Sequence, residues 1–134
     1  MKKRERRIVK GYIREIADLL GARDWDVALR NEPCDDDWNA QVRLIYGRKR
    51  AEVRVHRYFA EMDAERIRQT IVHEVVHFHF AATSNQAEHD LKGHLSEQAR
   101  DVFFSGWLRN LEYGIDGLAV AVAPHMPLID WSKA

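Results

Sequence analysis

Apolar residues recur with helical spacing near the start of the chain. Between Arg6 and Leu20 they fall three or four residues apart, and Gly21 then supplies a stop signal. The apolar positions of this predicted helix are Ile8, Val9, Tyr12, Ile13, Ile16, Leu19 and Leu20. Next, Trp25, Val27 and Leu29 alternate with smaller or polar residues, which predicts a short strand.

Two more strand-like segments follow an acidic loop at residues 31–37. Residues 39–46 and 51–58 are joined by Gly47 and three basic residues, which predicts a hairpin. In the second segment, one face holds Ala51, Val53 and Val55, and the other holds Glu52, Arg54 and His56. The predicted sheet is therefore covered on one side and open to water on the other.

A longer helix is predicted to begin after Asp63, which suits the N-cap position, and to run to about Ala82. The rest of the chain is again helical in pattern, with a predicted break near Gly114 to Gly117 and a stop at Pro124. This order of elements predicts an α+β fold. A small, largely antiparallel three-stranded sheet would pack on the helix that follows Asp63.

Composition narrows the classes of function. Lys and Arg number 21 and balance 21 Asp and Glu, which disfavours a protein whose main task is to hold nucleic acid. Cys34 is the single cysteine, so an intramolecular disulfide and a cysteine-based zinc finger are excluded. Because neither a membrane-spanning segment nor a signal-peptide pattern occurs, we expect a cytoplasmic protein with no membrane contact. One domain covering residues 1–134 is expected.

Positive charge is concentrated at the N-terminus. The residues concerned are Lys2, Lys3, Arg4, Arg6 and Arg7. We favour a solvated helix start as their role, and contact with nucleic acid or a partner is the alternative.

The helix predicted after Asp63 carries the sequence His73-Glu74-Val75-Val76-His77. On a helix, His73 and His77 lie one turn apart on the same face, where both can bind one metal ion, and Glu74 lies beside that site. The flanking residues are apolar, and polar side chains on an apolar helix are costly to bury without a partner such as a metal ion. An ordinary buried helix with two hydrogen-bonded histidines is the alternative.

A catalytic zinc ion usually has three protein ligands, so a third would lie downstream. We favour Glu112, because neighbours such as Leu108 and Ile115 predict that it lies, with Asp116, on the buried side of a helix. The first alternative is Glu97, which is closer to His77 in sequence but has polar neighbours. The second is His94.

Residues 70–79 resemble the signature of the zincin metallopeptidases, in which uncharged residues flank the HExxH motif. Two pairs, Glu97 with Asp101 and Glu112 with Asp116, match the E-x-x-x-D pattern of the glutamate-ligand zincins, the gluzincins, where the aspartate orients a ligating histidine. Residues 111–128 and the turn at residues 46–51 are similar to parts of small metallopeptidases encoded by phages and prophages.

This resemblance implies a minimal zincin fold and zinc-dependent hydrolysis of a protein or peptide substrate. Zn²⁺ would be held by His73, His77 and Glu112, with Glu74 as the general base. In such a fold the strand before the motif helix borders the cleft and accepts the substrate at its edge, which implies that the segment Glu52 to Tyr58 lies there. Three side chains could stabilise an oxyanion, and the sequence aims none of them: Tyr58, Tyr113 and His125.

A second class of function stays open. Gly93 and His94 resemble the third-ligand region of the SprT-like proteases, which act on DNA-bound proteins, with Leu95 where a glycine is usual. The chain would then be a non-proteolytic zinc-binding protein, or a DNA-associated one that contacts nucleic acid or a partner through its basic N-terminus.

Overall fold

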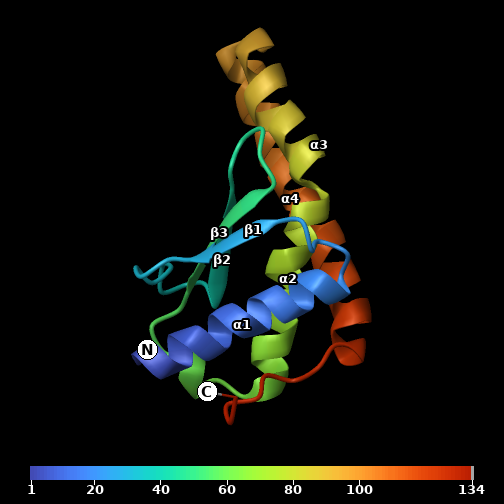
Figure 1. The fold of residues 1–134 in the computed structure, drawn as a ribbon. Helices are drawn as coiled ribbons and strands as arrows, with labels where there is room; N and C mark the ends of the chain where they lie inside the picture. Colours follow the sequence, from blue (N-terminus) through green and yellow to red (C-terminus); the bar gives the residue numbers. More distant parts are fainter. Residues whose placement is uncertain (134) are drawn as a thin grey trace.

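The computed structural model describes residues 1–133 and has the α+β architecture that the sequence predicts (Figure 1). The main elements in chain order are α1 (Lys3–Leu19), β1 (Asp26–Leu29), β2 (Ala40–Leu44), β3 (Arg50–Val55), α2 (Ala64–His79), α3 (Ala81–Asn85) and α4 (Glu97–Val122). Short turns of helix, η1 to η4, occupy Phe59–Glu61, Gln86–Leu91, Lys92–His94 and Ala123–His125. The predicted first helix, first strand and hairpin are all present, each with slightly different ends.

The three strands form a mixed sheet in the order β1-β3-β2. β2 and β3 are antiparallel, with Val42 opposite Val53, whereas β1 runs parallel to β3. The prediction that the segment Glu52 to Tyr58 lies at the sheet edge is therefore wrong. The acidic loop carries the chain past β3, where the amide of Cys34 donates to Val55 O at 3.3 Å. This crossing leaves β2 as the edge strand beside α2.

One face of the sheet is covered by α1 and α2, which share a core with it (Figure 1). Ile13 and Ile16 of α1 pack with Val53 of β3 and with Ile71 of α2, and each of these side chains is almost completely buried. Gly21, with φ of +79°, ends the first helix as predicted, in the left-handed region that favours glycine. The opposite sheet face lacks this apolar cover, in agreement with the alternation in β3.

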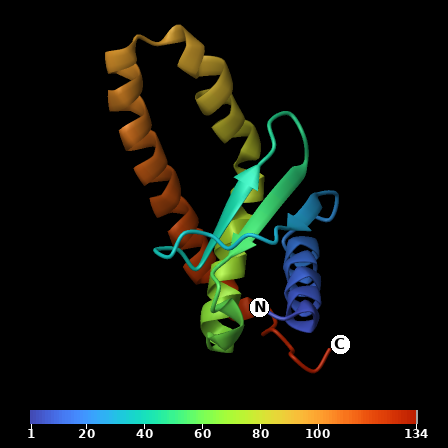
Figure 2. The same ribbon diagram turned by 90° about the vertical axis from the view of Figure 1, so that its left-hand side faces the viewer.

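The predicted break near Gly114 to Gly117 is wrong, because α4 continues unbroken from Glu97 to Val122. Ile115 and Ala119 are 0% and 1% exposed, and their burial outweighs the cost of about 1 kcal/mol for each helical glycine. The chain turns earlier, before Ser96, whose Oγ accepts a hydrogen bond from the amide of Ala99 at 3.3 Å. Figure 2 shows the result: α3 and the first half of α4 project beyond the sheet as a helical hairpin.

Part of the basic N-terminal cluster is used inside the molecule. Arg6 donates to the carbonyls of Leu29 and Arg30 at 3.3 and 2.9 Å, and Arg4 donates to Trp131 O at 3.3 Å. These bonds hold the start of α1 against the end of β1 and the C-terminal segment. Within residues 1–133, we find no helix that combines the length and the apolar character needed to cross a membrane.

Candidate metal centre

α2 carries the motif on the side that faces α4 and β2. Asp63 caps the helix as predicted, since its Oδ1 accepts a hydrogen bond from the amide of Arg66 at 2.8 Å. Apolar side chains such as Ile71 hold the opposite side of the helix in the core. His73 and His77 therefore lie at the boundary between core and solvent, with 20% and 14% of their side chains exposed.

α4 brings Glu112 to the two histidines. Its Oε2 lies 3.2 Å from His73 Nε2, its Oε1 lies 3.2 Å from His77 Nε2, and the two Nε2 atoms are also 3.2 Å apart. Each residue offers one ligand atom, and all three atoms lie within 4.8 Å of one another. The group of His73, His77 and Glu112 could therefore hold a metal ion.

Asp116 makes the second contact from α4, one turn beyond Glu112. Its Oδ1 lies 2.9 Å from His73 Nδ1, and because an ionised carboxylate can only accept, this contact favours the tautomer with the proton on Nδ1. In the neutral ring, Nε2 then directs a lone pair at Glu112 Oε2, which is also an acceptor. A cation between these two acceptors would relieve their repulsion, and this donor set fits a metal ion for that reason. A second proton on His73 is the metal-free alternative.

His77 also suits a metal ligand. Burial lowers the pKa of His77 to about 4, the neighbouring His73 acts in the same direction, and Asp116 opposes them. The ring is therefore neutral at physiological pH and keeps an unshared lone pair. Metal ions bind histidine in this neutral form.

Glu74 is the buried carboxylate of the centre, with 7% of the residue exposed. Burial raises the pKa of Glu74 to about 8, the charge of Glu112 adds to the rise, and a hydrogen bond from the backbone of Val42 opposes it. The side chain of Glu74 lines the cleft between α2 and the edge strand β2. A carboxyl group with such a pKa can both take up and release a proton near neutral pH.

The backbone pattern of β2 explains the contact with Val42. The amide of Ile45 donates to Arg50 O of β3, and Asn39 O accepts from the amide of His56, which follows β3, at 2.9 Å each. Odd-numbered residues thus pair with β3, and the even-numbered ones direct their N–H and C=O groups to the free edge. The amide of Val42 points from that edge towards Glu74.

A cleft of about 370 Å³ lies over the candidate metal cluster, formed by His73, His77 and Glu112, and over the free edge of β2. It is lined by His73, Glu74 and His77 from α2, Glu112 from α4, and Ala40 to Arg43 from β2, together with Trp38, Glu52 and Arg54. A second hollow of about 530 Å³ shares Trp38, Ala40, His73, Glu74 and Glu112 and continues to Thr70 and Asp116. The groove therefore extends to both sides of the cluster.

The alternative third ligands do not reach the motif. Glu97 is exposed at the start of α4, about 22 Å along the helix axis from Glu112 at a rise of 1.5 Å per residue. His94 is exposed in the turn before α4. In the described part of the chain, the group that could hold a metal includes neither residue.

The predicted burial of Glu112 and Asp116 is wrong. The side chains of Glu112 and Asp116 are 40% and 68% exposed, so neither lies on the buried side of α4. The buried contacts are made by Ile115 and Ala119, and the two acids flank this stripe where it meets α2. The three side chains proposed for an oxyanion, Tyr58, Tyr113 and His125, are exposed, and none of them lines the cleft that the described residues form.

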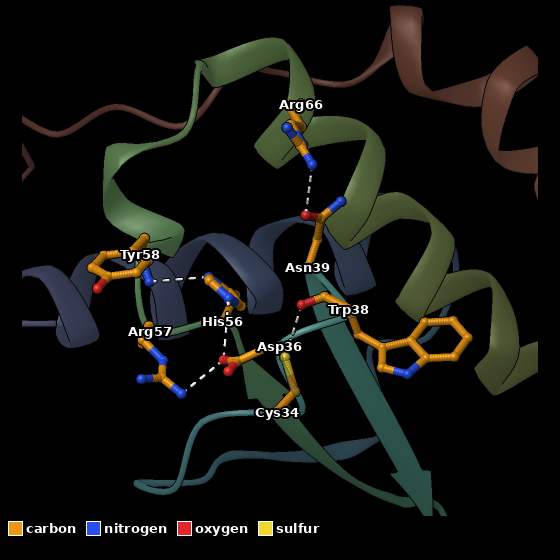
Figure 3. Close-up of polar contacts among 8 residues, drawn as sticks. All are labelled: Cys34, Asp36, Trp38, Asn39, His56, Arg57, Tyr58 and Arg66. Carbon is orange, nitrogen blue, oxygen red and sulfur yellow. Dashed lines mark hydrogen bonds and ion pairs between the residues drawn. The ribbon is translucent and has the colours of Figure 1, made fainter.

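Trp38 is a cleft residue that the sequence pattern did not indicate. Its carbonyl accepts a hydrogen bond from Cys34 Sγ at 3.2 Å, and the next residue, Asn39, accepts from Arg66 Nη2 at 2.9 Å and from the amide of His56 at 2.9 Å (Figure 3). Figure 3 shows the indole pointing away from these bonds, towards α2. The acidic loop is thus fixed on both sides of an exposed aromatic ring.

Arg43 and Arg54 are two further cleft residues. Strand alternation identifies them as outward-facing, but it cannot show that the cleft passes over the edge of β2.

Comparisons with protein families, with characterised proteins and with solved structures find no match to this chain.

Proposed function

We propose that this chain is a zinc-dependent peptide hydrolase, in which His73, His77 and Glu112 bind the metal ion and Glu74 is the general base. One observation carries the proposal: Glu74 and the free edge of β2 line the same solvent-open cleft, beside the three-residue cluster of His73, His77 and Glu112. A strand edge offers backbone groups to an extended peptide, and a base next to a metal site can serve hydrolysis.

Zinc suits this donor set better than the other common divalent ions do. Two imidazole nitrogens and one carboxylate are a usual ligand set for catalytic zinc, which keeps a further position for water. Magnesium and calcium prefer oxygen ligands alone.

The chain's own residues have distinct roles in the proposed reaction. Bound zinc would supply a Lewis acid for the attacking water and for the carbonyl of the peptide. Glu74 takes the proton of the water and delivers it to the leaving amine. Positive charge at the cluster favours the ionised form of Glu74, which is the form that can accept this proton. Asp116 keeps His73 in one tautomer and one orientation.

The substrate would bind as an extended segment along β2. Its backbone can pair with the edge groups of Ala40 and Leu44 on either side of Val42. This places the substrate backbone next to Glu74 and the cluster. Because β3 is the central strand, β2 replaces the segment Glu52 to Tyr58 in this role.

Metal content and cleavage together test the proposal. The purified protein should contain about one zinc ion per chain and cleave an unfolded protein such as reduced casein. Glu74→Gln should keep the metal and lose at least a factor of about 100 in kcat/KM. Cleavage that survives Glu74→Gln with zinc bound would refute the role of Glu74. Zinc that survives Glu112→Ala would refute the ligand set, and Glu97→Ala is the matched control.

The DNA-associated alternative draws less support from the fold. Arg4 and Arg6 are engaged in bonds within the molecule, and His94 lies outside the metal cluster. Salt-sensitive DNA binding that disappears on removal of Met1 to Arg7, without any cleavage of unfolded proteins, would favour that alternative.

A further inference from the structure

Two arginines line the cleft without a carboxylate partner. Arg43 of β2 and Arg54 of β3 lie on the sheet face opposite the core, and both line the cleft over the metal cluster. Among residues 1–133, neither has an acidic group within the 4.0 Å of an ion pair. Other arginines of the sheet region are paired: Arg50 with Asp26 at 3.4 Å and Arg57 with Asp36 at 2.7 Å.

The nearest acid by strand register is already engaged. Glu52 lies opposite Arg43, but its Oε1 is 3.8 Å from Nη1 of Arg30. Arg30 directly follows β1, which lies on the other flank of β3 from β2. Arg54 lies opposite Gln41, which carries no charge. The two guanidinium groups therefore leave positive charge on the β2 side of the cleft, in a chain whose formal net charge is +0.

Arg43 and Arg54 flank Val42, which lines the cleft together with the general base Glu74. Arg43 follows Val42 along β2, and Arg54 pairs with Gln41, which precedes Val42. An extended peptide advances about 3.3 Å per residue beside such a strand. Substrate side chains that can reach the two arginines therefore belong to residues within about two positions of the substrate residue opposite Val42.

We propose that Arg43 and Arg54 bind a carboxylate side chain of the substrate, and that the protein cleaves peptides with Asp or Glu within about two residues of the cleaved bond. This inference rests on the proposed peptide hydrolysis.

The alternative role of the two arginines is protective: charged side chains on an edge strand also prevent pairing with another chain. Protection alone predicts aggregation of the variants without a change in substrate choice.

A peptide library separates these roles. The zinc-loaded full chain is incubated with peptides from digested cell protein, and the cleaved bonds are identified by mass spectrometry. Asp and Glu should be enriched near the cleaved bond, and kcat/KM for a matched Asp and Asn peptide pair should differ by about tenfold at low salt. Arg43→Gln and Arg54→Gln should each reduce this ratio to below about threefold. Arg43→Glu should shift the preference towards Lys and Arg. Arg23→Gln, an exposed arginine away from the cleft, is the matched control and should keep the full ratio.

Binding gives a readout that is independent of turnover. Zinc-loaded Glu74→Gln protein should bind the Asp peptide about tenfold more tightly than the Asn peptide. The double variant with Glu74→Gln and Arg43→Gln should bind the two peptides equally well. Cleavage with equal rates for both peptides, or a ratio unchanged in both arginine variants, would overturn this inference and leave peptide hydrolysis standing. An oligonucleotide that competes as well as the Asp peptide at equal salt would overturn it in favour of nucleic acid. No cleavage by any zinc-loaded form would overturn peptide hydrolysis, and this inference with it.

Discussion

The two halves of α4 lie in different environments. In the half near the sheet, Ile115 and Ala119 are 0% and 1% exposed. In the projecting half, Val102 is 73% exposed and Leu108 is 50% exposed. Glu112 lies at the transition, about one turn before Ile115. The packed half fixes the position of this carboxylate, so the candidate metal cluster depends on core packing and not on the projecting hairpin.

The largest expected effect comes from the packed half. Ile115→Ala should lower the free energy of unfolding by about 2–5 kcal/mol, because it leaves a cavity in the core. Val102→Ala in the projecting half should change it by less than about 0.5 kcal/mol. Urea denaturation of both variants measures the contrast. Equal losses would show that the two halves are equally packed in solution.

The second effect is the pH dependence of the metal-free protein. The pKa of Glu74 is raised to about 8 in the folded state from 4.5, so the carboxyl favours folding fully below pH 4.5 and progressively less as the pH rises to 8. Glu74→Gln removes this loss, and the variant should gain roughly 2–4 kcal/mol over the parent protein between pH 5 and pH 8.

His77 contributes with the opposite dependence. Its folded pKa of about 4 lies below the ordinary 6.5, so stability falls as the pH drops from 6.5 to 4 in the parent and in the variant alike. The difference between the two proteins therefore isolates Glu74. Glu97→Gln, in the projecting half, is the control and should follow the parent at every pH. Parallel curves for Glu74→Gln and the parent would contradict a raised pKa at Glu74.

The third effect is stabilisation by metal. Zinc at 100 times its dissociation constant should add about 2.7 kcal/mol to the free energy of unfolding, because it binds the folded chain. Glu112→Ala should abolish most of this gain, and Glu97→Ala should keep it. Thermal unfolding with and without a chelator gives the measurement. A gain in stability that depends on Glu97 would place the metal site in the projecting half of α4 and contradict the proposed ligand set.

The smallest effect is expected at the contact between Asp116 and His73, behind the candidate metal cluster. Asp116→Asn should weaken zinc binding by about 10- to 100-fold, because it disturbs the partner that orients His73. Asp101→Asn, on the exposed surface of the projecting half, should leave the affinity unchanged. Competition with a chromophoric chelator measures both. Equal affinities for the two variants would show that Asp116 does not orient the ligand.

Local patterns were enough to predict much of this molecule. The helical positions of His73, Glu74 and His77 and the alternation in β3 depend on residues close in sequence, and the structure agrees with both. Glu112 does approach the two histidines, but without the burial that its helical neighbours predict. Contact with α2 decides its position, and contact between helices is a tertiary property.

The predictions that the structure contradicts also depend on tertiary contacts. Glycine propensity predicted a break at Gly114 to Gly117, and the burial of Ile115 overrides it. The edge strand is β2 and not the predicted segment, because strand order depends on how the acidic loop crosses β3. Arg43 and Arg54 could be recognised as outward-facing, yet their approach to the cleft follows from the position of α2 beneath the free edge of β2.

The positions of the three candidate ligands along the chain have a mechanical consequence. His77 is near the end of α2 and Glu112 is in the second half of α4, so the chain between them contains the whole projecting hairpin. A metal ion shared by these residues would act as a cross-link that closes this loop, much as a disulfide would. The angle at which the hairpin leaves the body would then be set by the same three side chains that hold the ion.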